Sequence, residues 1–222
     1  MLAQRLTVVR EGIAAACVSA GRDSSEVPLI VVTKFHPVSV MRELFELGVR
    51  DFGENRHQEA EAKAAELGDL DLNLHFIGQL QSNKAAAVRR YADVIHSVDR
   101  AALVTALGKA SDDVLECFLQ LNLTDDPSRG GVAPGDLVAL AELAAATPSL
   151  RVLGVMAVAP LATDPRPAFV RVREASEVLQ GVIPAATFIS AGMSYDYVEA
   201  IAEGATHLRI GTAITGERPP AS

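Results

Sequence analysis

Residues 27–36 read VPLIVVTKFH, and this stretch decides between two folds. Its centre, residues 29–32, is entirely aliphatic, which is typical of a parallel strand buried on both faces. In an open doubly wound sheet, the first strand normally leads into a glycine-rich turn that binds the ligand. Here the strand ends in Thr33, Lys34, Phe35 and His36, without a glycine. The stretch therefore favours a closed (β/α)8 barrel over an open sheet.

The rest of the chain alternates between short apolar runs and helical patterns. The runs that predict strands are 27–34, 49–53, 72–78, 94–98, 115–123, 151–158, 186–190 and 206–211. Helices are predicted at 38–47, 56–67, 82–91, 100–110, 135–146, 166–180 and 195–203. A leading helix over about 2–20 is expected to cover the seam where an eighth helix is missing. Such alternation predicts one α/β domain over residues 1–222, a single TIM-type barrel with an extra N-terminal helix.

The composition excludes several classes of partner. The 28 acidic residues exceed the 20 basic ones, which gives a net charge of −8. A field of that sign repels nucleic acid and anionic lipid, so we expect neither as a partner. The sequence shows neither a membrane-length apolar window nor the apolar core of a signal peptide. Cys17 and Cys117 are the only cysteines, which fits a reducing compartment, and we expect a cytoplasmic protein.

Lys34 differs from the other lysines of the chain in its setting. Lys63, Lys84 and Lys109 lie in charged helical patterns and are expected to face solvent, whereas Lys34 ends an apolar strand. In a TIM barrel, chemistry belongs at the carboxyl ends of the strands. An amine desolvated there would have a lowered pKa and could attack a carbonyl group. The alternative is a lysine whose side chain escapes to solvent at the barrel rim.

The loops after the last two predicted strands have the composition of a phosphate site. Hydroxyl groups and glycines gather there, at Ser190, Gly192, Ser194, Gly211 and Thr212. Glycines let backbone N–H groups approach a phosphate closely, and barrels favour these two loops for phosphate. A helix beginning near residue 195 would add the positive end of its dipole. Ordinary strand-to-helix turns use the same residue types, so this alternative stays open.

Arg209 precedes Gly211 by two residues in the last predicted strand. Period-two alternation places Arg209 in the barrel interior, where an unpaired guanidinium is costly. It needs an acceptor there, for which a pyridine nitrogen and the carboxylate of Glu54 are equal candidates. The histidines show no metal-ligand spacing, so no metal site is expected.

Several stretches of this chain together resemble the pyridoxal phosphate homeostasis proteins, the YggS/PROSC family, over nearly the whole length. They are VVTK (31–34), GEN with Gln58 and Glu59 (53–59), HFIGQLQSNK (75–84), HSVD (96–99), GVMAV (154–158), SAGMSYD (190–196) and RIGTAITG (209–216). The resemblance implies the barrel of the alanine racemase N-terminal domain, without that enzyme's second β domain. It also implies pyridoxal 5′-phosphate (PLP) as cofactor.

The same resemblance assigns roles to residues of this chain. It implies that Lys34 binds PLP as a Schiff base and that Arg209 faces the pyridine nitrogen. Ser194, Gly211 and Thr212 would bind the phosphate, with Ser190 beside that loop, while Asn55 and Met156 would line the ring pocket. Ala191 and Thr215 depart from the usual family residues, a methionine and a bulkier apolar side chain. Both departures lie beside the site and bear on the shape of the pocket.

Three functions are compatible with these residues. The first is a PLP carrier that keeps the free aldehyde low and passes it to PLP-dependent apoenzymes, working as a monomer without catalytic turnover. The second is an amino-acid racemase, which needs a base on each face of the substrate and would require a substitute such as Tyr195 or His36. The third is a lysine-dependent aldolase acting on a sugar phosphate. The resemblance favours the carrier.

Overall fold

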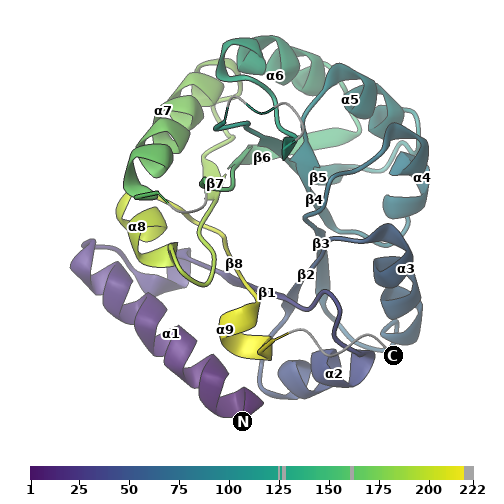
Figure 1. The fold of residues 1–222 in the computed structure, drawn as a ribbon. Helices are drawn as coiled ribbons and strands as arrows, with labels where there is room; N and C mark the ends of the chain where they lie inside the picture. Colours follow the sequence, from purple (N-terminus) through teal and green to yellow (C-terminus); the bar gives the residue numbers. More distant parts are fainter. Residues whose placement is uncertain (125, 127–128, 161–162, 218–222) are drawn as a thin grey trace.

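A computed structural model describes residues 1–124, 126, 129–160 and 163–217. Eight parallel strands form one sheet in the order β7-β6-β5-β4-β3-β2-β1-β8. They are β1 (Leu29–Val32), β2 (Asp51–Glu54), β3 (Asn73–Phe76), β4 (Val94–Val98), β5 (Leu115–Gln120), β6 (Leu150–Met156), β7 (Phe188–Ser190) and β8 (Leu208–Ile210). A parallel bridge between Ser190 and His207 joins the two ends of the sheet. The predicted closed barrel is confirmed (Figure 1).

Helices surround the barrel and follow its strands along the chain (Figure 1). They are α2 (Val38–Glu46), α3 (His57–Glu66), α4 (Ala85–Val88), α5 (Ala101–Gly108), α6 (Leu137–Ala145), α7 (Arg166–Val182), α8 (Tyr197–Ala202) and α9 (Thr212–Thr215). The predicted helix over 82–91 is shorter than expected, because residues Ser82–Lys84 form a 3₁₀ turn before α4. The helix predicted from residue 195 begins two residues later, at Tyr197.

The leading helix α1 (Leu2–Ser19) covers the side of the barrel where α9 is only one turn long. It packs against α8 and α9, beside β8 and β1 (Figure 1). Its buried side chains include Leu6, Val9, Ile13 and Cys17, spaced three or four residues apart on one helical face. The expectation that this helix closes the seam is confirmed.

The barrel has an outer core between strands and helices and a smaller core in its lumen. Val94, Phe118 and Met156 form the lumen cluster, separate from the large outer cluster. Ile30 and Val32 also face the lumen, because both are buried but only Val31, between them on β1, belongs to the outer cluster. Their alternation along β1 determines which way the next residues of the chain point.

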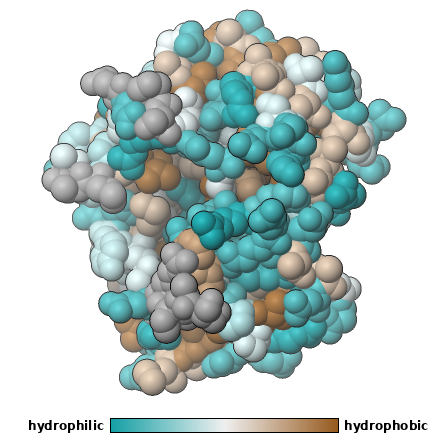
Figure 2. Space-filling view, turned by 45° about the vertical axis from the view of Figure 1, so that its right-hand side comes forward, coloured by the Kyte–Doolittle hydropathy of each residue, from teal (hydrophilic) through white to brown (hydrophobic). Residues whose placement is uncertain are grey.

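The surface seen when the right-hand side of Figure 1 comes forward is largely hydrophilic, with apolar residues in small groups (Figure 2). Among the helices that the structure describes, none combines the length and apolar character that crossing a membrane requires.

Candidate functional site

Lys34 lies at the carboxyl end of β1, as the sequence predicted. The N–H of Thr33 donates to the carbonyl oxygen of Gly53 at 3.1 Å, so the strand pairing with β2 continues to the residue before Lys34. Since Ile30 and Val32 face the lumen, alternation places Lys34 on the lumen side, above them. Lys34 is nevertheless exposed. Of the two alternatives that the sequence left open for Lys34, the structure shows the exposed lysine at the rim, because the strand ends before Lys34 and leaves it at the open mouth.

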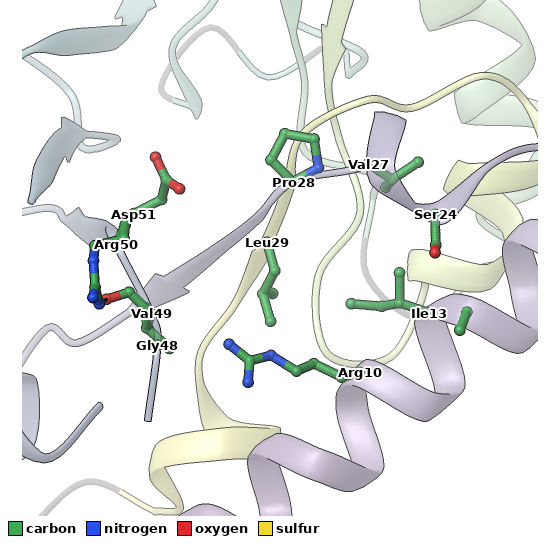
Figure 3. A pocket seen from close by; sticks show the side chains of 11 residues that line it. Arg10, Ile13, Ser24, Val27, Pro28, Leu29, Gly48, Val49, Arg50 and Asp51 are labelled. Atoms are coloured by element: carbon green, nitrogen blue, oxygen red, sulfur yellow. Dashed lines mark hydrogen bonds between the residues drawn. The ribbon is translucent and has the colours of Figure 1, made fainter. Parts of the chain in front are cut away.

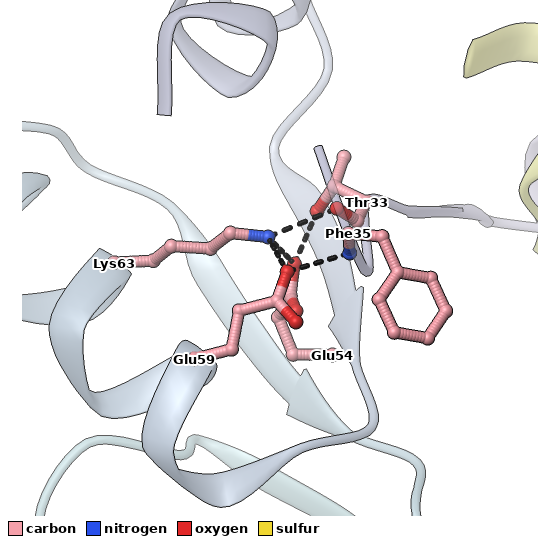
Figure 4. Close-up of polar contacts among 5 residues, drawn as sticks. All are labelled: Thr33, Phe35, Glu54, Glu59 and Lys63. Atoms are coloured by element: carbon pink, nitrogen blue, oxygen red, sulfur yellow. Dashed lines mark hydrogen bonds and ion pairs between the residues drawn. The ribbon is translucent and has the colours of Figure 1, made fainter. Parts of the chain in front are cut away.

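Both neighbours of Lys34 are held by a buried ionic cluster on the outer side of the strand. Lys63, on α3, donates to the carbonyl oxygen of Thr33 at 2.9 Å and to carboxylate oxygens of Glu54 and Glu59, each at 2.7 Å. The backbone N–H of Phe35 donates to Glu59 at 2.6 Å, and the hydroxyl of Thr33 donates to Glu54 at 2.7 Å. Figure 4 shows these side chains converging from β1, β2 and α3. We call these five residues the α3 clamp.

The clamp corrects the prediction that Lys63 faces solvent. Its side chain is 6% exposed and that of Glu54 is fully buried. Burial raises the pKa of Glu54, and the ammonium of Lys63 opposes that shift. The ammonium of Lys63 lies between the two carboxylates and offsets part of their charge, while Oε2 of Glu54 is buried without a hydrogen-bond partner. Phe35 has a φ of 68°, a left-handed conformation that is strained for a bulky residue, and its hydrogen bond to Glu59 holds it there.

Arg209 lies in the lumen, as its alternation predicted, and is 4% exposed. It is paired in register with Ile30 of β1. Its guanidinium donates to the hydroxyl of Ser190 at 2.5 Å and to the carbonyl oxygen of Ala157 at 2.8 Å. Burial lowers the pKa of Arg209 to about 10. Within the described part of the chain, Arg209 forms no ion pair with a carboxylate.

The alternative pairing of Arg209 with Glu54 is therefore wrong. Glu54 points outward from β2 to Lys63, whereas Arg209 points inward from β8. Alternation puts the two side chains on opposite faces of the sheet. The guanidinium of Arg209 is therefore a buried cation whose hydrogen bonds go only to neutral acceptors. Its remaining donors suit a further neutral acceptor in the lumen.

The loops after β7 and β8 meet, as expected for a phosphate site. The N–H of Ala213 donates to the hydroxyl of Ser194 at 3.3 Å, which connects the two loops. Gly192 has a φ of 92°, a conformation that L side chains rarely adopt. A Cβ atom on Gly211 would lie 3.3 Å from the backbone oxygen of Val32 and 3.3 Å from its Cβ. Gly211 therefore packs tightly against β1. Thr212 is exposed at the start of α9.

Asn55 follows β2 at the same end of the barrel. Its side-chain oxygen is buried without a hydrogen-bond partner, which is costly unless a ligand supplies a donor. Gly78 crosses directly over the backbone of Asn55, and a Cβ atom there would overlap its carbonyl group. Met156 is 2% exposed within the lumen cluster, so it lines the floor beneath the mouth. Ala191 and Thr215, which depart from the family pattern, are both accommodated. Ala191 is buried, and the hydroxyl of Thr215 donates to the carbonyl oxygen of Gly211 at 3.2 Å.

Sequence reasoning missed Arg5 on α1. Arg5 donates to the carbonyl oxygen of Thr215 at 3.2 Å, and its Nε is buried without a partner. It lines a cavity of about 370 Å³ together with Ser194, Tyr197 and Ala213. A cation therefore lies beside the loops after β7 and β8. The sequence feature that could have indicated Arg5 is its position immediately before Leu6, which is buried. This position puts the arginine at the edge of the buried face of the helix.

Known proteins are similar to this chain over most of its length. The family described as alanine racemase, N-terminal domain, matches residues 23–219. The pyridoxal phosphate homeostasis protein of Corynebacterium glutamicum is 44% identical over 208 residues, covering 89% of this chain and 93% of that protein. The protein of the same name from Pseudomonas aeruginosa is 42% identical over 224 residues, covering 98% and 96%. The chain belongs to the pyridoxal phosphate homeostasis protein family.

Solved structures show the same barrel. PipY of Synechococcus elongatus PCC7942, determined with PLP bound, matches with a TM-score of 0.86 at 37% identity, covering 97% of this chain and all of PipY. Alanine racemase from Corynebacterium glutamicum matches with a TM-score of 0.72 at 17% identity, and the match covers 62% of that chain. At this identity the racemase shows the fold alone. The resemblance read from the sequence motifs is confirmed.

Proposed function

We propose that this protein binds PLP through Lys34 and serves in intracellular PLP homeostasis, storing the cofactor and releasing it to apoenzymes. The observation that carries the proposal is the placement of Lys34 just beyond the carboxyl end of β1 and of Arg209 in the lumen on the neighbouring strand β8. The amine of Lys34 suits the aldehyde of pyridoxal. The buried guanidinium of Arg209, which is bonded only to neutral acceptors, suits the ring nitrogen at the other end. The family of the chain and the PLP bound in PipY support the proposal.

The polar groups of the site fit this cofactor. Lys34 supplies the amine that bonds to the aldehyde carbon, and its exposure leaves it open to the incoming cofactor. Arg209 has donors beyond its bonds to Ser190 and Ala157 for a pyridine nitrogen. The partnerless oxygen of Asn55 suits the donor that a ring hydroxyl offers. Met156 and the lumen cluster below give the ring an apolar floor.

The phosphate fits the two loops that meet at Ser194. Ser194, Gly211 and Thr212 offer hydroxyl and backbone N–H donors, and Ser190 lies below them on β7. Arg5 adds a positive charge from α1, close to the same loops. Charge-assisted hydrogen bonds to an anion are stronger than those between neutral groups, so this end of the site supplies most of the affinity.

A carrier fits these residues better than a racemase. When bound, PLP supplies an aldehyde that reacts with amines, and a homeostasis protein restrains that reactivity. Tyr195, one substitute base that the sequence suggested, is 90% exposed. His36, the other, is buried, and burial followed by the charge of Lys63 lowers its pKa. An arginine at the ring nitrogen also keeps that nitrogen unprotonated, which weakens the electron sink that racemisation requires.

Spectroscopic titration with PLP tests the proposal. Wild-type protein should develop a visible band distinct from that of free PLP, saturating at one equivalent. Lys34→Ala should abolish the band, and Lys84→Ala, which removes an exposed lysine after β3, should retain it. A band of wild-type intensity in Lys34→Ala would refute the assignment of Lys34.

Delivery to apoenzymes, cytoplasmic location and a monomeric state remain predictions. For delivery, the protein loaded with PLP should activate an apo-aminotransferase faster than release into an amine trap allows. Activation no faster than that release would mean that the protein stores PLP but does not hand it over. Sedimentation of the purified protein checks the monomer.

A further inference from the structure

A continuous chain of hydrogen bonds crosses the barrel lumen below the proposed cofactor site. Asp51 Oδ1 lies 3.0 Å from His75 Nε2, and His75 Nδ1 lies 3.0 Å from His96 Nε2. His96 Nδ1 lies 2.8 Å from the hydroxyl of Ser190, which accepts from Arg209 at 2.5 Å. Asp51 is the first residue of β2 and Ser190 is the last of β7, so the chain runs between the two ends of the barrel. We call it the lumen chain.

The chemistry of its members gives the lumen chain one direction. A guanidinium only donates, so Ser190 accepts from Arg209 and is free to donate its own proton to Nδ1 of His96. A neutral His96 then carries its proton on Nε2 and donates to Nδ1 of His75. His75 in turn carries its proton on Nε2 and donates to the carboxylate of Asp51. Every donor points away from Arg209 toward Asp51.

The charges of these groups agree with that direction. Burial lowers the pKa of His96 well below its ordinary value, so its ring is neutral. Burial acts to raise the pKa of Asp51, but hydrogen bonds from His75 and Asn73 outweigh it and lower this pKa. The ring of His96 is fixed by stacking on Phe118, with 4.5 Å between ring centroids. A cation and an anion therefore occupy the two ends, with the neutral ring of His96 between them.

We propose that Asp51, His75 and His96 are positioning residues for the cofactor, acting through Ser190 on Arg209. The carboxylate of Asp51 fixes the tautomer of His75, and His75 fixes that of His96. The His96 tautomer turns the hydroxyl of Ser190 away from Arg209 and leaves a lone pair for the guanidinium. This holds Arg209 where its remaining donors face the ring nitrogen. The inference rests on the proposed function, since it assigns these residues to PLP.

Asp51 is reachable from outside the cofactor site. Its side chain is 30% exposed and lines a cavity of about 380 Å³ at the amino-terminal end of the barrel, with Arg10 and Arg50. Figure 3 shows Asp51 on β2 at the edge of this cavity, its side chain leaving the strand in a different direction from that of Arg50. A substitution at Asp51 therefore changes one end of the lumen chain without touching a residue at the cofactor mouth.

Nitrogen-15 NMR of the histidine rings tests the lumen chain without any cofactor. In the wild-type protein at pH 8, the lumen chain requires the proton on Nε2 and not on Nδ1 of both His75 and His96. In Asp51→Leu, which removes the acceptor, His75 and His96 should each show a mixture of tautomers. A proton on Nδ1 of His96 in the wild-type protein would overturn the inference, and so would unchanged tautomers in Asp51→Leu.

PLP titration tests the consequence for binding. Asp51→Leu, which removes the acceptor for His75, should bind PLP about fivefold more weakly, the fold-change of one ordinary hydrogen bond. Asp51→Asn keeps an acceptor and should bind more tightly than Asp51→Leu, and Asp71→Leu, a matched change before β3 and outside the lumen chain, should bind as the wild type does. Wild-type affinity in Asp51→Leu would overturn the inference while leaving the proposed function intact. A wild-type protein that binds no PLP would refute the proposed function, whatever the tautomers.

Discussion

The Nζ atom of Lys63 lies 2.7 Å from Oε1 of Glu54 and 2.9 Å from the carbonyl oxygen of Thr33. A side chain on α3 thus holds the residue that immediately precedes Lys34. Glu59, one helical turn before Lys63, holds the residue that follows it. Lys34 is exposed, but its backbone is fixed on both sides, so its amine starts from a defined position at the barrel mouth.

Replacement of Lys63 should destabilise the protein. Lys63→Met leaves the buried carboxylate of Glu54 without its cation, and loss of one partner from a buried ion pair costs about 3–5 kcal/mol. Urea unfolding should show this loss, and the surviving folded protein should bind PLP more weakly than the wild type. Lys84→Met, at an exposed lysine, is the control and should change stability by less than about 0.5 kcal/mol. Equal stabilities for the two variants would show that the α3 clamp does not hold the strand end.

A side chain at Gly78 should disturb Asn55. Gly78→Ala forces a methyl group against the backbone of Asn55, and overpacking of this kind costs about 1–3 kcal/mol. PLP affinity should fall with it, because Asn55 lines the proposed ring pocket. Gly181→Ala is the matched control, since a Cβ atom there meets nothing within 4 Å on helix α7. That variant should be stabilised by about 0.5–1 kcal/mol and bind PLP normally. Normal binding by Gly78→Ala would remove Asn55 from the site.

The fold and the lumen-facing residues followed from local patterns in the sequence. The aliphatic run at 29–32 and the strand-helix alternation predicted the barrel. Period-two alternation placed Arg209 in the lumen, because one strand determines which side its own residues face. The sequence also indicated Lys34 and the loops at Ser194 and Gly211, since polar and glycine residues interrupt apolar strands there.

The α3 clamp and the lumen chain could not be predicted in the same way. Lys63 follows Glu59 by four residues, which on a helix resembles a solvent-exposed ion pair. Its burial depends on Glu54 pointing outward from a neighbouring strand. His75 and His96 lie on β3 and β4, and no spacing in the sequence links them to Ser190 on β7. Closure of the barrel brings them together, and that is a property of the whole fold.

Acid should destabilise the protein through His207. Burial, followed by the charge of His75, lowers the pKa of His207 to about 4, against about 6.5 in an unfolded chain. The unfolded state therefore binds a proton that the folded state rejects, so stability is full above pH 6.5 and falls as the pH drops toward 4. His207→Phe, which keeps the ring contacts to Phe118 and Phe188, should reduce this slope by up to about 1.4 kcal/mol per pH unit. Urea unfolding at pH 5, 6 and 8 checks it, and an unchanged slope would contradict it.

The phosphate loops should contribute more to PLP affinity than the ring nitrogen contact. Ser194→Ala combined with Thr212→Ala removes donors to a charged group, each worth about 1.5–3 kcal/mol. Arg209→Gln still offers one donor to the ring nitrogen and should weaken binding less. The control, Ser25→Ala with Thr187→Ala, removes the same groups at the amino-terminal end. A larger effect from Arg209→Gln would mean that the ring and phosphate are placed differently.

The central claim is that Lys34 carries the cofactor, and reductive trapping followed by peptide mapping tests it most directly. Protein loaded with PLP is reduced with borohydride, digested, and the modified lysine is identified by mass spectrometry. We expect one pyridoxyl group per chain, on the peptide that contains Lys34. Label on Lys63, Lys84 or Lys109 instead, or label spread evenly over the lysines, would contradict the account.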